Sequence, residues 1–241
     1  MTRRIHATLV ACVALILLSV PSNPGLAAAQ SLEESALCGA PGTPAASPGA
    51  TPATDRAAGS GGHRIELESG EALVWPAGDR GVLLLHGAAY DAASWEPQAE
   101  MLAVQGFTVL SLESLSPEAI QEGIGFLTVE CGATGVTVIG ASAGGNAALG
   151  ALAEDPPGVT GLVLLGATGE VGTLGEYPKL FTASEGEGLA DRLATMADEA
   201  PGDRNETLVL PGSAHAQAIF ESEQGDALIG AILAFLDETA P

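Results

Sequence analysis

The stretch Gly135–Leu152, which reads GVTVIGASAGGNAALGAL, decides the fold of this chain. Its first part, Gly135–Ile139, is a short run of apolar and β-branched residues, which is typical of a strand buried on both faces. The residues after Ser142 are small and apolar, as in a helix that packs closely on a sheet. Between the two segments lies the pattern G-x-S-x-G, from Gly140 to Gly144. The stretch therefore predicts a strand, a sharp turn centred on the serine, and a helix.

The pattern gives Ser142 the position of a nucleophile. A serine at a strand-to-helix turn adopts a strained backbone that lifts its hydroxyl clear of the sheet. Glycines two residues before and after it are needed because side chains there would collide with neighbouring backbone. The turn also lies at a helix N-terminus, where free N–H groups favour developing negative charge. The alternative is a Gly/Ser loop without chemistry, which the flanking strand and helix disfavour.

Residues 1–29 have the pattern of a secretory signal peptide. A basic start with Arg3 and Arg4 precedes an apolar core, and an Ala-x-Ala cleavage site ends at Ala29. The apolar run is too short for a comfortable membrane span. We therefore expect export, cleavage before Gln30, and a secreted or cell-envelope protein without stable membrane insertion.

The rest of the chain is long enough for one domain. Removal of residues 1–29 from the 241 leaves about 212, which is an ordinary domain size. Residues 30–62 are predicted to be a disordered tether, because from Gly39 onward they are almost entirely Ala, Pro, Gly, Ser and Thr. The folded domain is expected to comprise residues 63–241.

The charge balance excludes some partners. Without the leader, 6 basic residues remain against 30 acidic ones, a net charge of −24. Such a surface repels nucleic acid and anionic lipid. We therefore expect no nucleic-acid partner.

Two cysteines remain in the exported protein, because Cys12 is removed with the leader. In an oxidising compartment, Cys38 and Cys131 are expected to form one disulfide. The alternative is two free thiols.

Apolar strands alternate with helices through the domain. A hairpin of Arg64–Leu67 and Ala72–Trp75 opens it. Further strands are expected at Gly81–Leu85, Phe107–Leu112, Gly161–Leu165, Lys179–Ala183 and Glu206–Leu210, and helices from Ser94 to before Gly106, from Ser116 to about Thr128, at Leu189–Ala197 and at Asp226–Asp237. This order predicts an α/β fold with a mainly parallel sheet flanked by helices on both faces. Its active site should lie at the carboxyl ends of the strands.

A serine needs a base to take its proton, and the domain holds three histidines. His63 starts the domain and is expected to be solvated. His86 ends a strand in a His-Gly step, where a hydrogen bond to the neighbouring turn is the better interpretation. His215 follows the last strand, at the sheet edge where a base could reach Ser142, and is the candidate general base.

The base must be oriented by a carboxylate. The strand Lys179–Ala183 runs into Ser-Glu-Gly-Glu-Gly, which places Glu185 and Glu187 at the carboxyl edge of the sheet. Glu170, after the preceding strand, is a more distant candidate. The residues alone leave the choice open.

Serine, acid and histidine in this order, each after a strand, together with His86-Gly87 at the end of an early strand, resemble the α/β-hydrolase superfamily over about residues 64–240. The chain is similar to small lidless members of the dienelactone-hydrolase-like type, with Ser142 in place of their cysteine. The resemblance implies an α/β-hydrolase fold without a cap domain. Only about a dozen residues separate Leu165 from Lys179, where relatives with a lid insert a helical cap.

The resemblance also assigns roles. The family's acid lies three positions beyond a small residue that ends its strand, and Ser184 in that place points to Glu187, although most members have aspartate there. The oxyanion hole would consist of the backbone N–H groups of Ala143 and Ala88, with Ala89 as a substitute for the latter. Tyr90 and Trp95 could form walls of the acyl pocket; simple packing is the alternative for both.

The implied reaction is acyl transfer through an acyl-enzyme, and the implied protein is a secreted serine hydrolase that cleaves small or short-acyl carboxylic esters. A catalytically silent binding module, or a peptidase or acyltransferase with the same triad, is the alternative. The sequence contains no metal-ligand cluster, phosphate-binding glycine loop or nucleotide fingerprint beside the site, so no metal or cofactor is expected.

Overall fold

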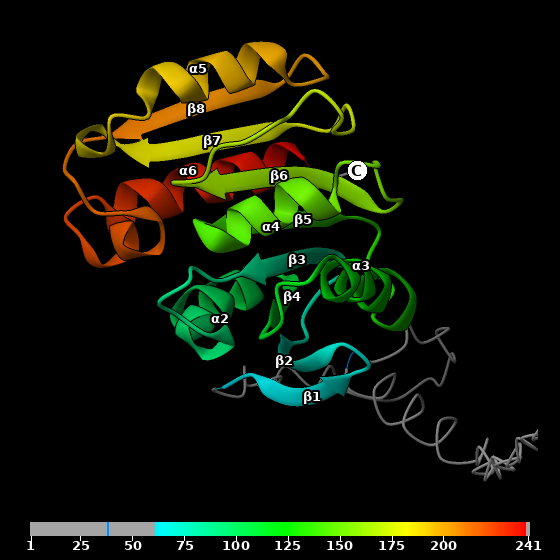
Figure 1. Cartoon of the computed structure of the whole chain (residues 1–241). Coiled ribbons are helices and arrows are strands. Elements are labelled where there is room, and N and C mark those ends of the chain that lie inside the picture. The colour runs from blue at the N-terminus through cyan, green and yellow to red at the C-terminus, as the bar shows by residue number, and fades with distance from the viewer. Residues whose placement is uncertain (1–37, 39–60, 240–241) are drawn as a thin grey trace, which may run out of the picture.

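The computed structural model describes Cys38 and residues 61–239 (Figure 1). The predicted signal peptide, and the predicted tether apart from Cys38, Gly61 and Gly62, lie outside the described residues. The predicted domain is described up to Thr239. None of the described helices is long and apolar enough to cross a membrane.

Eight strands form one sheet in the order β1-β2-β4-β3-β5-β6-β7-β8. The hairpin β1–β2 joins the rest through an antiparallel β2–β4 pair, and all other pairs are parallel. The strands are β1 His63–Leu67, β2 Gly70–Trp75, β3 Arg80–Leu85, β4 Phe107–Leu112, β5 Val136–Ala141, β6 Val159–Leu165, β7 Lys179–Ser184 and β8 Asn205–Leu210. All six residues of β5 are buried, as its apolar, β-branched sequence predicts. The predicted mainly parallel sheet with an antiparallel hairpin is confirmed.

Helices cover both faces of the sheet (Figure 1). On one face, α3, α4 and α5 contribute side chains to one apolar core; on the other, α2 and α6 contribute to a second. The helices are α2 Glu96–Val104, α3 Pro117–Gly125, α4 Ala143–Ala151, α5 Ala190–Glu199 and α6 Gly225–Glu238, with short helical turns η1 Ala92–Trp95, η2 Phe126–Glu130, η3 Glu185–Glu187 and η4 Ala216–Glu221. The sheet is therefore buried between two layers, and its loops remain at the two strand ends.

Of the two serines predicted to cap helices, Ser116 does so and Ser94 does not. Ser116 caps α3, since its side chain accepts a hydrogen bond from the Ala119 N–H at 3.2 Å. The prediction that Ser94 caps the preceding helix is wrong. Asp91 caps the turn η1 instead, by accepting from the Ser94 N–H at 2.9 Å, and α2 begins only after η1. The pattern missed this turn because aspartate and serine are both good caps and lie three residues apart.

The connection between β6 and β7, residues 166–178, contains turns and no helix. This is the place where a cap would be inserted. The described domain thus has no cap, as the resemblance implied.

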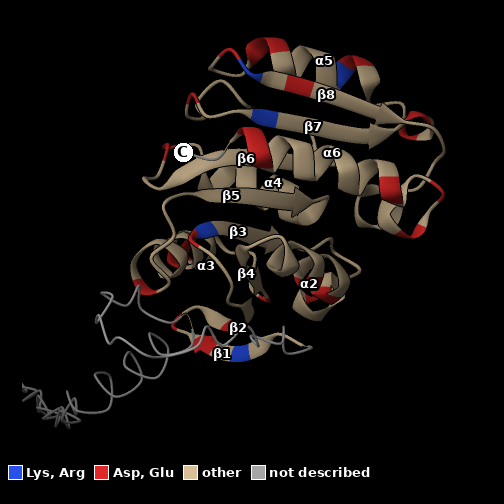
Figure 2. Ribbon diagram, turned by 180° about the vertical axis from the view of Figure 1, so that it is seen from behind, with Lys and Arg blue, Asp and Glu red and all other residues tan. Residues whose placement is uncertain are grey.

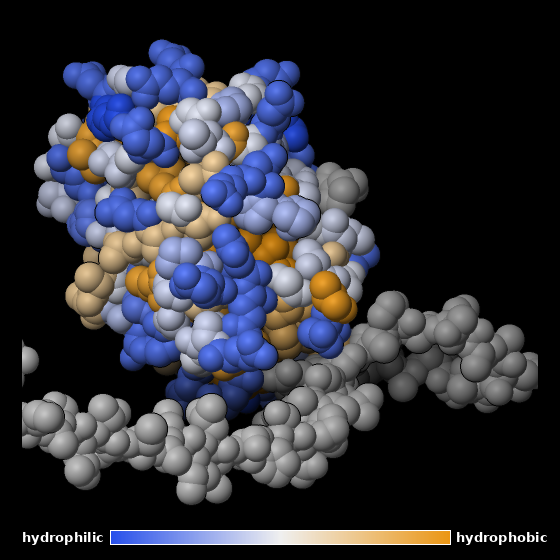
Figure 3. All heavy atoms as spheres, turned by 45° about the vertical axis from the view of Figure 1, so that its right-hand side comes forward, coloured by the Kyte–Doolittle hydropathy of each residue, from blue (hydrophilic) through white to orange (hydrophobic). Residues whose placement is uncertain are grey.

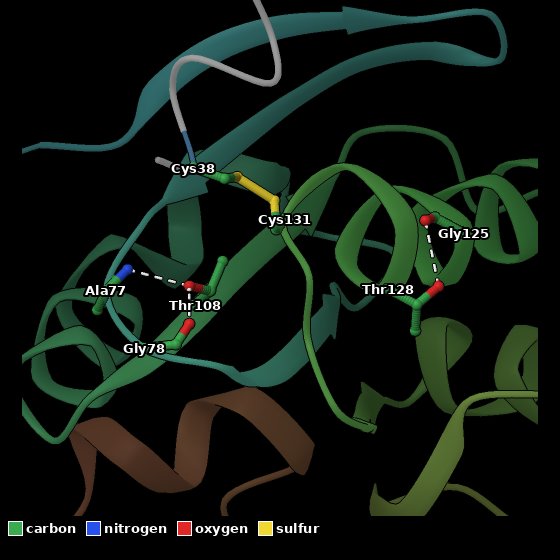
Figure 4. The surroundings of a disulfide bond; sticks show 7 residues. All are labelled: Cys38, Ala77, Gly78, Thr108, Gly125, Thr128 and Cys131. Atoms are coloured by element: carbon green, nitrogen blue, oxygen red, sulfur yellow. Dashed lines mark hydrogen bonds between the residues drawn. A yellow bond between two sulfur atoms is a disulfide. The ribbon is translucent and has the colours of Figure 1, made fainter. Parts of the chain in front are cut away.

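The predicted disulfide between Cys38 and Cys131 is present (Figure 4). Cys131 lies just before β5, and Figure 4 also draws Thr108 near the start of β4, whose hydroxyl accepts from the Ala77 N–H and donates to the Gly78 carbonyl. This is the amino end of the sheet, whereas Ser142 follows the carboxyl end of β5. The bond therefore joins position 38 to the domain at the end opposite the nucleophile.

The described surface is predominantly acidic. Asp and Glu are spread over most elements, and Lys and Arg are few (Figure 2). Figure 3, which brings the right-hand side of Figure 1 forward, shows apolar residues on that face as separate patches among hydrophilic ones. The acidic residues therefore come from many separate elements of the chain.

Candidate active site

Ser142 occupies a strained turn between β5 and α4. Its backbone has φ 49° and ψ −107°, a left-handed conformation that non-glycine residues rarely adopt. Its N–H donates to the Leu165 carbonyl at 2.8 Å, which anchors the turn to the end of the neighbouring strand β6. The predicted sharp turn is confirmed.

Steric clashes explain why the pattern has glycine at positions 140 and 144. A Cβ on Gly140 would lie 2.7 Å from Gly145 Cα, and one on Gly144 would lie 2.3 Å from the Leu85 carbonyl oxygen. Both distances are far below a van der Waals contact, and the atoms that would have to move are backbone. Any side chain at either position would therefore push α4 away from the sheet.

The sheet register brings the loops of the site to one edge. Leu85 at the end of β3 pairs with Gly140 in β5, and Ala141 pairs with Leu165 at the end of β6. Ser184 in β7 pairs with Leu210 at the end of β8. The segments that follow these strands therefore leave the sheet at the same edge, on the left-hand side of Figure 1.

Ser142, His215 and Glu187 form one chain of hydrogen bonds. His215 Nε2 lies 2.8 Å from Ser142 Oγ, and His215 Nδ1 lies 2.5 Å from Glu187 Oε1. A carboxylate only accepts hydrogen bonds, so the neutral imidazole carries its proton on Nδ1. Nε2 is then free to accept from the serine hydroxyl, which is the arrangement that a general base requires.

Glu187 is held rigidly in this chain. Its side chain is 8% exposed, and the second carboxylate oxygen accepts from the Ser184 N–H at 2.7 Å. The Ser184 hydroxyl donates to the Ala214 carbonyl at 2.6 Å, which ties the loop after β7 to the loop that carries His215. Glu185 and Glu170 are exposed. Of the three predicted glutamates, Glu187 is the one that the structure brings to His215.

Gly166 belongs to the site, although the sequence pattern did not single it out. It follows β6 with φ +60°, and a Cβ there would lie 2.9 Å from His215 Cε1 and 3.0 Å from Glu187 Oε1. The histidine and glutamate therefore pack directly over this glycine. Its one sequence signal is a glycine immediately after a buried strand.

Gly87, the residue before the predicted oxyanion donor Ala88, lies against the nucleophile. A Cβ on Gly87 would lie 3.9 Å from Ser142 Cβ, and Ala88, the next residue, is exposed. Ala143 is the first residue of α4, so its N–H has no acceptor within the helix. Tyr90 also lies close, since its Cδ2 would be 3.3 Å from a Cβ on Gly87. Ala143 thus directly follows Ser142, and Gly87, which precedes Ala88 and contacts Tyr90, lies beside the serine.

Other residues singled out in the sequence lie away from this chain of hydrogen bonds. His86 is buried, with Nδ1 2.9 Å from the Gly87 carbonyl and Nε2 3.1 Å from the Glu113 carbonyl, as the turn interpretation expects. His63 is an exposed residue at the start of β1. Trp95 is 1% exposed and packs edge-on against Phe220. A side chain so buried has no surface for a substrate, so the assignment of Trp95 to the acyl pocket is corrected to a core role.

The described residues contain no group of three or more His, Cys, Asp or Glu side chains that could hold a metal ion. Ser142, His215 and the residues around them supply the reactive groups of the site. These provide a hydroxyl beside an oriented imidazole, with free backbone N–H groups nearby.

No protein-family model matches the chain, and no curated protein matches it. Solved structures do. A dienelactone hydrolase from Anabaena variabilis ATCC 29413 is 17% identical, with a TM-score of 0.60 over 72% of this chain and 95% of that one. A thermophilic esterase from Thermogutta terrifontis is 15% identical, with a TM-score of 0.57 over 74% of this chain and 100% of that one.

A monoacylglycerol lipase from Paleococcus ferrophilus is 14% identical, with a TM-score of 0.58 over 70% of this chain and 98% of that one. At such identities the likeness concerns the fold. It agrees with the sheet order, the turn at Ser142 and the uncapped connection between β6 and β7. The chain therefore has the α/β-hydrolase fold, in a small form without a cap that is similar to a dienelactone hydrolase.

Proposed function

We propose that this protein is a serine hydrolase that cleaves small or short-acyl carboxylic esters through an acyl-enzyme intermediate. The observation that carries the proposal is the unbroken chain of hydrogen bonds from Ser142 through His215 to Glu187. Esterases and a dienelactone hydrolase are among the structures of the same fold, which agrees with a hydrolase.

In the first half of the proposed reaction, Ser142 Oγ attacks the ester carbonyl carbon while His215 Nε2 takes the hydroxyl proton. Glu187 stabilises the imidazolium that forms. The carbonyl oxygen becomes an oxyanion that accepts from the N–H groups of Ala143 and Ala88. Each such donor contributes about 3–4 kcal/mol of transition-state stabilisation in enzymes where one has been removed. The tetrahedral intermediate then collapses, and His215 gives its proton to the leaving alcohol.

The second half repeats these steps with water. His215 takes a proton from the water molecule as its oxygen attacks the acyl carbon. The same two N–H groups hold the second oxyanion, and Ser142 Oγ leaves with the proton from His215. The acid product departs and the hydroxyl is restored.

The proposed preference for small acyl groups follows from the open site. The His215 side chain is 55% exposed, and the connection 166–178 provides no helix to cover it. Without a cap, little apolar surface is available to contact a long chain.

The test is covalent labelling with a fluorophosphonate probe together with hydrolysis of p-nitrophenyl acetate. Wild type should be labelled and active, and Ser142→Ala should lose both properties. Ser69→Ala, which changes a serine in the β1–β2 turn, is the control and should behave as wild type. An unlabelled wild type would indicate a silent binding module. Cleavage of a matched amide at the ester's rate would favour a peptidase.

We also propose that the protein is exported and that residues 1–29 are removed. The basic start, apolar core and Ala-x-Ala site support this, and the disulfide agrees with an oxidising compartment. Mass spectrometry of the secreted protein should find Gln30 at its N-terminus. A mature chain that still begins at Met1 would contradict cleavage.

A further inference from the structure

We propose that Gln217 is a positioning residue that holds the oxyanion loop, residues 86–88, in place beside Ser142. This inference rests on the proposed function, because it assigns the loop a part in ester hydrolysis. Gln217 lies two residues after His215, at the start of η4, and is 5% exposed.

Both ends of the Gln217 amide are used. Its Oε1 accepts from the Gly87 N–H at 3.2 Å, and its Nε2 donates to Ser94 Oγ at 2.8 Å. Ser94 Oγ in turn donates to the Asp91 carbonyl at 2.5 Å. The side chain therefore connects the segment after β8 to both ends of the loop between β3 and α2. A buried amide with both groups paired fixes its partners, because breaking either bond leaves a polar group unpaired.

The oxyanion loop needs such support because Gly87 has no side chain to restrict its backbone. The Gly87 carbonyl accepts from the Tyr90 N–H at 3.0 Å and faces His86 Nδ1 at 2.9 Å. A trans peptide is planar, so the Ala88 N–H must point opposite to this carbonyl. These contacts orient the peptide after Gly87, and Gln217 holds the peptide before it. With both peptides held, the direction of the Ala88 N–H is set.

The same segment carries the base. Ala216, between His215 and Gln217, has φ 50° and is buried, a conformation that alanine adopts only when its surroundings impose it. The His215 carbonyl accepts from the Ala218 N–H at 3.0 Å. One rigid turn therefore presents the imidazole to Ser142 and the amide to Gly87. The base and the oxyanion donor are aligned with each other by neighbouring residues of one segment.

The experiment compares wild type with Gln217→Met, which keeps the length of the side chain and removes both hydrogen bonds. Kinetics on p-nitrophenyl acetate should show kcat lower by about 10- to 100-fold and KM changed by less than about threefold, because the loop acts mainly in the transition state. A trifluoromethyl ketone probes the same contact. Ser142 Oγ adds to its carbonyl carbon, His215 takes the proton, and the resulting oxyanion occupies the same place. Its inhibition constant should rise by the same factor as kcat/KM falls.

Gln217→Glu keeps an acceptor for the Gly87 N–H but loses the Nε2 donor to Ser94 and places a buried negative charge near the oxyanion, so it should not restore kcat. Gln98→Met is the matched control: Gln98 is partly buried on α2, and its Oε1 has no hydrogen-bond partner among the described residues. It should behave as wild type. If Gln217→Met does not fold, Ser94→Ala carries the test, because it frees the amide and should lower kcat by about three- to tenfold.

Wild-type kcat in folded Gln217→Met would overturn the inference. So would a loss accompanied by a shift in the acidic limb of the pH–rate profile, since the side chain would then act through His215. These results are distinct from failure of the proposed function, which would appear as an inactive wild type or an active Ser142→Ala.

Discussion

Glu187, whose side chain is 8% exposed, places its Oε1 2.5 Å from Nδ1 of His215, whose side chain is 55% exposed. A buried acid thus holds a base that remains open to solvent and substrate. The carboxylate is fixed from behind by the Ser184 N–H, so the orientation of the imidazole depends on Glu187.

We therefore expect Glu187→Gln to lower kcat by about 10³- to 10⁴-fold, because the amide can favour the wrong tautomer of His215. Folding, measured by circular dichroism, and the accessibility of Ser142 should be unchanged. Glu185→Gln, at an exposed position two residues away, should stay close to wild type. The reverse ranking would give the role to Glu185, and two active variants would direct attention to Glu170.

Gly166→Ala should disturb the contact between His215 and Glu187. The added methyl group would lie 2.9 Å from His215 Cε1 and 3.0 Å from Glu187 Oε1. Displacing these groups should lower kcat about tenfold or more. The positive φ should also reduce the free energy of unfolding by about 1 kcal/mol.

Gly172→Ala is the control, because that glycine lies in the same connection with open space around it. It should leave both activity and stability unchanged. Equal effects at the two glycines would show that the connection as a whole is sensitive, and that contact with the His215–Glu187 pair is not the cause.

Lys179 should make stability depend on pH. It is fully buried at the start of β7, where Nζ donates to the carbonyls of Gly175, Tyr177 and Pro201 at 2.7 Å each. Burial lowers the pKa of Lys179 from 10.5 to about 8. From about pH 8 upward, the unfolded chain then binds more protons at this group than the folded protein does. The contribution of Lys179 to the free energy of unfolding should therefore rise with pH.

Urea unfolding of wild type and Lys179→Met between pH 7 and 9.5 measures this contribution. The free energy of unfolding of wild type, minus that of the variant, should increase as the pH rises above 8. The upper limit avoids the tyrosine range, since burial raises the pKa of Tyr177 to about 12 and this group opposes the trend above pH 10. Parallel curves would contradict the prediction.

Loss of the disulfide should affect stability and spare activity. The bond closes a span of 93 residues, and the chain-entropy model assigns such a loop about 4–5 kcal/mol as an upper figure. Cys38→Ser and Cys131→Ser should lower the melting temperature. The initial rate on p-nitrophenyl acetate at 20 °C should not change, because the bond lies at the amino end of the sheet. Two free thiols in unreduced wild type would contradict the pairing.

The acyl-chain preference can be measured with p-nitrophenyl esters of increasing length. We expect kcat/KM to be highest for acetate to butyrate and to fall for longer chains, because the uncapped site has little apolar surface to bind them. Activity that rises steadily with chain length, or that jumps at a lipid interface, would contradict this expectation.

The sequence by itself determined the layout of the fold. β-branched apolar runs such as Val136–Ile139 favour buried strands wherever they occur, and the small residues after Ser142 suit a helix packed on a sheet. The glycines at 140 and 144 indicated the turn because a Cβ at either position would strike backbone, that of α4 at Gly140 and that of the end of β3 at Gly144. The serine, acid and histidine could be placed at one edge because the carboxyl ends of parallel strands meet there.

Only the tertiary structure decided which side chains meet. Glu185 and Glu187 have the same chemistry and nearly the same position in the chain; the turn η3 brings one carboxylate to His215 and leaves the other in solvent. Trp95 follows the oxyanion loop in sequence, yet the inserted turn η1 leaves it in the core.

The contact made by Gln217 is the hardest to predict from the sequence. It contacts Gly87 across 130 residues of sequence, and no local pattern marks it. Periodicity and turn chemistry record what each segment buries and where it bends. The contacts between loops depend on strand order, register and the backbone conformation at single residues such as Ala216, which are settled when the whole domain packs.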